Sequence, residues 1–220
     1  MNKPIERHPR TTPPKDSNYI NAQMWFSTEA NTGGPEHTRI TQHLRATEAI
    51  FLSCNRSFVI RNVWAKGREG GDDSYGTSRT RLKAEDIDLD LSEDVRKVYN
   101  EYKGSFDEIN VLVCFVEGKY FAKNGRLSED IARTYPMSND ENFLVLLSEL
   151  TEPSVLAHEI GHVLNISNKN GRADDPDPYP NDPSHNANID NLMYPSQARV
   201  GGEIITPAQC DQFFNSNIIL

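Results

Sequence analysis

The sequence lacks features that several large classes of protein require. Its 220 residues contain no apolar run of about 18 residues, the length that a membrane-spanning helix needs. Positive charge is also scarce, because 23 lysines and arginines stand against 32 aspartates and glutamates, and the formal net charge is −9. Such a charge repels the phosphate backbone of nucleic acid and anionic lipid head groups. We therefore expect neither nucleic acid nor a membrane as a partner.

Cysteine is rare as well. The three cysteines, Cys54, Cys114 and Cys210, form no CxxC pair, so we expect at most one disulfide and no cysteine-based zinc site. Cys114 lies in the apolar run VLVCFV, which favours a buried, unreactive thiol. The first twenty residues lack the apolar middle of a secretory signal, so they leave the location of the protein unknown.

The remaining composition is that of a globular domain, since 36% hydrophobic residues are enough to bury a core. Strand and helix patterns alternate along the first two thirds of the chain, and two of the strands are almost entirely apolar, as central strands of a sheet are. This order predicts an α/β (α+β) fold with a twisted, mostly parallel sheet and packed helices. The expected strands are 19–26, 57–65, 109–117 and 142–150, and the expected helices are 38–54, 93–103 and 151–165.

The ends of the chain differ from this regular part. Residues 1–18 contain four prolines and no hydrophobic period, which is typical of an extended or disordered lead-in. We expect a single domain over 19–220, with an N-terminal subdomain at 19–165 and an irregular C-terminal subdomain at 166–220.

The chemistry is concentrated in His158-Glu159-Ile160-Gly161-His162, an HExxH pattern. On an α-helix, the two histidines lie about 40° apart on one face, so both imidazoles can bind one metal ion. Glu159 lies about 100° round from His158, where its carboxylate can reach a metal-bound water without binding the metal. An ordinary pair of surface or core histidines would show the same pattern.

The neighbouring residues support a helix here. Thr151 is available as its N-cap, and Pro153 falls in the first turn, where the missing N–H is harmless. An apolar stripe on the opposite side would pack against the sheet. Its members are Leu156, Ile160, Val163 and Leu164.

Further along, Asn191-Leu192-Met193-Tyr194-Pro195 resembles the methionine turn of the metzincin zinc metallopeptidases, and its MYP form is similar to the matrixin branch. The succession of strand, connection and HExxH helix over 142–165 and the segment ITPAQ also resemble that family. The resemblance spans about 19–216, but only 158–195 is specific. It implies a metzincin-like fold, one catalytic Zn²⁺, and Met193 in an apolar floor beneath it. It also implies an exported or extracellular protein.

The third ligand departs from the family pattern HExxHxxGxxH. Asn165 replaces the glycine, and we expect the chain to turn there because asparagine tolerates the left-handed conformation. Asn168 replaces the third histidine, but an amide oxygen is a poor zinc ligand. In matrixin-like sequences the third histidine precedes the turn methionine by eight residues, and His185 stands eight before Met193. We therefore expect His185 as the third ligand, with Asn168 as the alternative.

Other candidate groups are weaker. The insertion between Asn168 and His185 could hold Ca²⁺ on its carboxylates, although such a loop is more often merely solvated. The carboxylates are those of Asp174, Asp175, Asp177 and Asp182. The remaining histidines at 8, 37 and 43 are expected to be ordinary surface groups. No phosphate-binding glycine loop or GxSxG elbow competes with the metal site.

The resemblance implies a zinc endopeptidase that acts on a protein or peptide, with Glu159 as general base. It further implies that an extended substrate pairs with an edge strand, which we expect within 118–133, and that 196–206 forms a wall of the cleft. We expect a monomer. Two alternatives stay open: a metal-stabilised binding module with little or no turnover, and a toxin or effector protease of narrow specificity.

Overall fold

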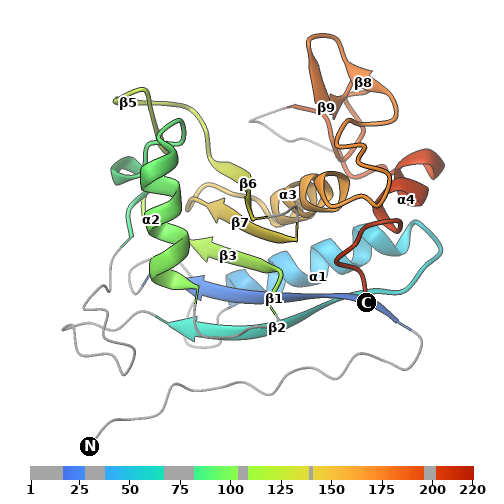
Figure 1. Cartoon of the computed structure of the whole chain (residues 1–220), viewed down its shortest axis with the longest axis horizontal. Coiled ribbons are helices and arrows are strands. Elements are labelled where there is room, and N and C mark those ends of the chain that lie inside the picture. Colours follow the sequence, from blue (N-terminus) through green and yellow to red (C-terminus); the bar gives the residue numbers. More distant parts are fainter. Residues whose placement is uncertain (1–16, 28–37, 67–81, 104–108, 139–140, 196–201) are drawn as a thin grey trace, which may run out of the picture.

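A computed structural model describes residues 17–27, 38–66, 82–103, 109–138, 141–195 and 202–220 (Figure 1). Outside the described residues lie most of the expected lead-in, His8, His37 and the part of the expected cleft wall at 196–201.

A five-stranded sheet forms the centre of the molecule, in the order β2-β1-β3-β7-β6 (Figure 1). The first four strands are parallel to their neighbours, and only β6 runs antiparallel, along β7. The prediction of a mostly parallel sheet is therefore confirmed. The strands are β1 (Asn18–Phe26), β2 (Phe58–Lys66), β3 (Val111–Phe115), β6 (Ala132–Ser138) and β7 (Asn142–Leu147).

Helices cover both faces of the sheet. The helices α1 (Thr38–Leu52) and α3 (Pro153–Ile166) share one hydrophobic cluster with one face, and α2 (Ser92–Tyr102) shares a second cluster with the other. Successive residues of a strand point to opposite faces, so a strand covered on both faces must be apolar throughout. In β3, Val113 faces α1 and α3 while Cys114 faces α2, and both are fully buried. Burial raises the pKa of the Cys114 thiol, as expected for an unreactive cysteine.

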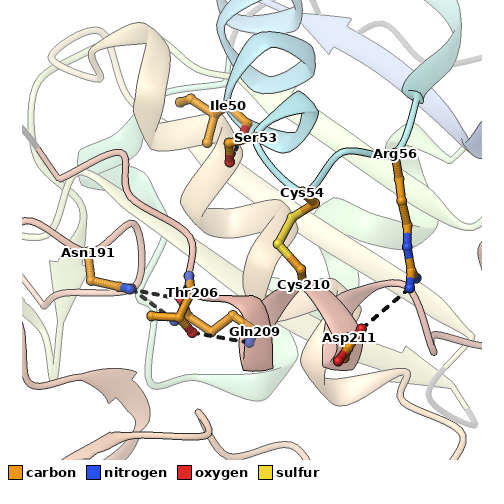
Figure 2. Close-up of a disulfide and its surroundings, with 9 residues drawn as sticks. All are labelled: Ile50, Ser53, Cys54, Arg56, Asn191, Thr206, Gln209, Cys210 and Asp211. Atoms are coloured by element: carbon orange, nitrogen blue, oxygen red, sulfur yellow. Dashed lines mark hydrogen bonds and ion pairs between the residues drawn. A yellow bond between two sulfur atoms is a disulfide. The ribbon is translucent and has the colours of Figure 1, made fainter.

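The chain after α3 is built from short elements. A hairpin of β8 (Pro178–Tyr179) and β9 (Asp182–Asn186) leads to a turn and then to the helix α4 (Pro207–Phe213). A disulfide between Cys54 and Cys210 joins the chain just after α1 to α4 (Figure 2). One bridge agrees with the expectation of at most one. No helix among the described residues is long and apolar enough to cross a membrane.

The edge strand lies later in the chain than predicted. Residues 118–131 hold another hairpin, of β4 (Ala122–Lys123) and β5 (Arg126–Leu127), which is outside the main sheet. Its turn uses positive φ angles at Asn124 and Gly125, 52° and 70°. The edge strand that follows this hairpin, β6, therefore begins only at Ala132. Its Pro136 is tolerated because an edge strand has one unpaired side.

Two side chains near the HExxH pattern also differ from expectation. Thr151 is not the N-cap, since its hydroxyl donates to the Ser148 carbonyl at 2.9 Å and Glu152 occupies the cap position. The chain does not turn at Asn165, because α3 continues to Ile166 and the Asn165 amide oxygen accepts a hydrogen bond from Gln212 on α4 at 2.9 Å.

His43 is not a surface group, because only 1% of it is exposed. It stands three residues after Ile40 and four before Thr47, on the buried face of α1. Burial, aided by the charge of Arg39, lowers the pKa of His43 to about 3.

Candidate metal centre

Three histidines from two separate elements converge at one point. His158 and His162 lie one turn apart on α3, and His185 comes from β9. One ring nitrogen of each lies within 4.8 Å of the others, and the Nε2 atoms of His158 and His162 are 3.0 Å apart. Among the described residues, this is the only group of three or more histidine, cysteine or acidic side chains that could hold a metal ion. The arrangement supplies three imidazole donors to a single position.

Hydrogen bonds fix the orientation of two of these rings. The Nδ1 atom of His158 lies 2.8 Å from the Leu192 carbonyl oxygen, so this nitrogen donates and leaves Nε2 with its lone pair. The Nδ1 atom of His185 lies 2.8 Å from a carboxylate oxygen of Asp182. Partial burial would raise the pKa of Asp182, but hydrogen bonds from His185 and Ser184 outweigh it and lower the pKa below its ordinary value. Both rings thus direct Nε2 away from these partners.

Glu159 is buried beside the histidines, with 5% of the residue exposed. Its Oε2 atom accepts a hydrogen bond of 2.7 Å from the hydroxyl of Thr134 on β6. No motif in the sequence points to Thr134. The two residues are 25 positions apart, and only the packing of the edge strand beside α3 brings them together.

Met193 lies directly under α3. It is fully buried, and a Cβ atom placed on Gly161 would lie 2.5 Å from its sulfur atom. Glycine therefore lets α3 approach the turn at 191–195 more closely than any larger residue would. This contact places Met193 beneath the same turn of helix that carries His158 and His162.

Asn168 does not share this position. Its side-chain amide donates to the Gln212 carbonyl at 2.6 Å, and its oxygen accepts from the backbone of Asn170 at 2.8 Å. It lines a separate pocket beside α4, whereas all three histidines line the cleft described next.

The histidines open into a cleft of about 510 Å³ between β6 and β9. Residues 130–134 form one wall, and Asp182 and Ser184 lie on the other, so the lining is mixed in polarity. Calcium has no comparable support, since the Asp175 carboxylate is occupied by hydrogen bonds from Asn186 and Gln209. Glu159 and the three imidazoles line this cleft together with residues of β6.

Comparison with known proteins adds evidence on the fold. No family profile matches the chain, and no curated protein matches it in sequence. Metalloproteinase-II from Bacteroides fragilis shares its fold at 15% identity, with a TM-score of 0.51 over 97% of this chain and 58% of that one. This chain therefore spans little more than half the length of that protein. Archaemetzincin from Methanopyrus kandleri is similar at 10% identity, with a TM-score of 0.50 over 92% of this chain and 96% of that one. The chain thus has a fold that is also found in metallopeptidases.

Proposed function

We propose that the protein is a zinc-dependent endopeptidase of the metzincin type. His158, His162 and His185 hold the metal, Glu159 is the general base, and Met193 lies in the turn beneath them. The observation that carries this proposal is the convergence of three imidazole nitrogens beside a buried carboxylate in an open cleft.

The residues fit zinc well. Zinc prefers nitrogen and sulfur ligands, and three protein ligands with one open position are the arrangement of catalytic rather than structural sites. The hydrogen bonds on the outer nitrogens of His158 and His185 are the partners that metal-binding histidines usually have. Zinc bound in this way supplies Lewis-acid chemistry toward water and a peptide carbonyl group.

Proton transfer falls to Glu159. Its carboxylate removes the proton of the attacking water and delivers it to the leaving nitrogen of the peptide. Thr134 holds one oxygen of this carboxylate, so the hydroxyl limits the rotation of the side chain. The low exposure of Glu159 strengthens its hydrogen bond with Thr134 and its interaction with the attacking water, because little bulk water competes for the carboxylate.

The same geometry favours an extended peptide as the substrate. β6 is one of the two edge strands of the sheet, and its residues 132–134 line the cleft. An edge strand offers unpaired backbone groups to which a peptide can add as a further strand. Such pairing contacts backbone rather than side chains, so it supports cleavage inside a protein chain.

The test compares Glu159→Gln with Glu152→Gln, which changes an exposed glutamate next to the start of the same helix. Zinc content is measured by elemental analysis and activity by cleavage of an unfolded protein. We expect one zinc per chain in the parent and both variants. We also expect activity to fall by about 10²- to 10⁴-fold in Glu159→Gln alone, the usual contribution of a general base. Cleavage at the parental rate by Glu159→Gln would refute the mechanism.

The outcome also separates the alternatives. A parent that binds zinc but cuts nothing in a broad peptide library would be a binding module, and one that cuts a single sequence would be a narrow-specificity protease. The ligand assignment has its own test, since His185→Ala is expected to weaken zinc binding much more than Asn168→Ala.

A further inference from the structure

A buried carboxylate lies at the centre of the C-terminal part of the chain. Asp175 is only 3% exposed, and hydrogen bonds reach both of its oxygens. Oδ1 accepts from the backbone of Asp177 at 2.9 Å and from the side chain of Asn186 at 2.7 Å. Oδ2 accepts from the side chain of Gln209 at 2.5 Å. All three of these partners are donors, so both oxygens of this buried side chain have hydrogen bonds.

The first set of these contacts holds the strand that carries His185. Asn186 is the next residue on β9, so its bond to Asp175 anchors the strand directly beside the histidine. On the other side of His185, the backbone N–H of Asp175 donates to the Pro183 carbonyl at 2.8 Å. The strand is therefore tied to Asp175 both before and after His185.

The second set of contacts holds the turn beneath the metal-binding helix. Gln209 on α4 exchanges two side-chain hydrogen bonds with Asn191, of 2.8 and 2.9 Å (Figure 2). The oxygen of Asn191 also accepts from the backbone of Met193 at 2.8 Å. One chain of hydrogen bonds thus runs from Asp175 through Gln209 to Met193.

The far end of this network is fixed to the rest of the domain. Gln209 also takes part in a capping box with Thr206 at the start of α4. The next residue, Cys210, is disulfide-bonded to Cys54 beside α1 (Figure 2). Asp175 is consequently connected to α4 and, through the disulfide, to the end of α1.

From this network we infer that Asp175 is a positioning residue for the metal centre, which sets the place of His185 relative to the turn at Met193. The inference rests on the proposed function, in which His185 binds the metal. Two ligands on one helix are placed by the helix itself, but the third comes from a hairpin and requires its own support. Partners of this kind usually contribute about 10- to 100-fold to metal affinity.

The test is Asp175→Asn in the full chain, titrated in its metal-free form with Co²⁺ alone. Asparagine has nearly the same shape, but its NH2 group replaces one of the two acceptor oxygens and so faces the donor of either Asn186 or Gln209. We expect the dissociation constant for Co²⁺ to rise about 10- to 100-fold, and the visible absorption of the bound ion to change because the third imidazole is displaced.

The matched control is Asp88→Asn, at another buried carboxylate. Asp88 accepts backbone hydrogen bonds from Asn124 and Gly125 and so anchors the β4–β5 hairpin instead of β9. The Asp88→Asn variant should have a lower melting temperature than the parent. Its Co²⁺ affinity and the spectrum of its bound ion should stay at parental values. A purely structural role for Asp175 would make the two variants behave alike.

Each outcome decides the matter. If Asp175→Asn binds Co²⁺ with parental affinity and a parental spectrum, the inference is overturned and the proposed function stays intact. The same holds if Asp88→Asn weakens Co²⁺ binding as much as Asp175→Asn does. A parent that binds no Co²⁺ would refute the proposed function and the inference together. If Asp175→Asn does not fold, Asn186→Ala removes the side-chain bond from Asn186 to Asp175, together with the bond that Asn186 accepts from the backbone of Asn188. This variant should weaken Co²⁺ binding, and unchanged binding would overturn the inference.

Discussion

Gly161→Ala tests how closely α3 lies on the turn at Met193 beneath it. In an exposed helix, replacing glycine by alanine gains about 1 kcal/mol. Here the added Cβ would lie 2.5 Å from the sulfur of Met193 and 3.5 Å from the ring of Phe213. The first separation is roughly 1 Å shorter than an ordinary nonbonded contact. Because Met193 and Phe213 are both fully buried, neither side chain can simply move into solvent.

The magnitude follows from two opposing contributions. Overpacking a core by one methyl group costs about 1–3 kcal/mol, against the gain of about 1 kcal/mol from helix propensity. We therefore expect the free energy of unfolding to fall by up to about 2 kcal/mol in Gly161→Ala. At this chain length, each kcal/mol corresponds to a change of about 2–4 °C in melting temperature.

The decisive measurement is made in a second background. Met193→Ala alone should cost about 2–5 kcal/mol, because it leaves a cavity under the helix. In that background Gly161→Ala should be stabilising by about 1 kcal/mol, since the obstructing sulfur is gone. Urea unfolding of the four metal-free proteins, followed by circular dichroism, gives the coupling energy. If Gly161→Ala stabilises the parent as much as it stabilises Met193→Ala, the reasoning is refuted.

Three further predictions concern other parts of the molecule. Thr134→Val removes the hydrogen bond to Glu159 and should lower kcat about 10- to 100-fold without loss of zinc. Thr134→Ser, which keeps the hydroxyl, should retain activity. An unchanged kcat in Thr134→Val would exclude Thr134 from the mechanism. Replacing Cys54 and Cys210 by serine removes a crosslink between residues 156 positions apart, and the free energy of unfolding in urea should fall by about 2–5 kcal/mol. A reductant should destabilise the parent but not this double variant. The depressed pKa of His43, about 3 against 6.5, means that only the unfolded chain takes up this proton between those values. The contribution of His43 to stability is thus complete above pH 6.5 and is lost below it by up to about 1.4 kcal/mol per pH unit. His43→Leu should reduce this slope between pH 6.5 and 4, and an unchanged slope would contradict the assigned burial.

The order of strands and helices could be predicted from the sequence because the patterns are local. Residues 109–117 are mostly apolar on both faces, and the apolar residues of 38–54 recur at three- and four-residue spacing. Each pattern therefore indicates a strand or a helix from neighbouring residues alone. The edge strand was misplaced because the β4–β5 hairpin depends on two positive φ angles rather than on a hydrophobic pattern. His43 was misjudged because a polar residue on an otherwise buried face does not disclose its exposure.

The candidate site divides in the same way. The spacing within HExxH fixes the relation of His158 to His162, since both lie on one helix. Bringing His185 to them depends on the hairpin and on contacts between residues far apart in the chain, which spacing alone does not determine. The resemblance to metzincins pointed to His185, but neither Thr134 nor the Asp175 network has a sequence signature. Asn165, expected to end the helix, instead contacts α4, because the chain continues into an insertion rather than turning at once.

The disulfide has a practical consequence for anyone handling the protein. Cys54 and Cys210 enclose the three histidines, Glu159 and Met193 within one covalent ring. A single proteolytic nick anywhere between residues 55 and 209 would leave the two fragments bonded to each other. Such a nick in a stored sample would therefore escape notice on a non-reducing gel, and the integrity of the sample has to be judged after reduction.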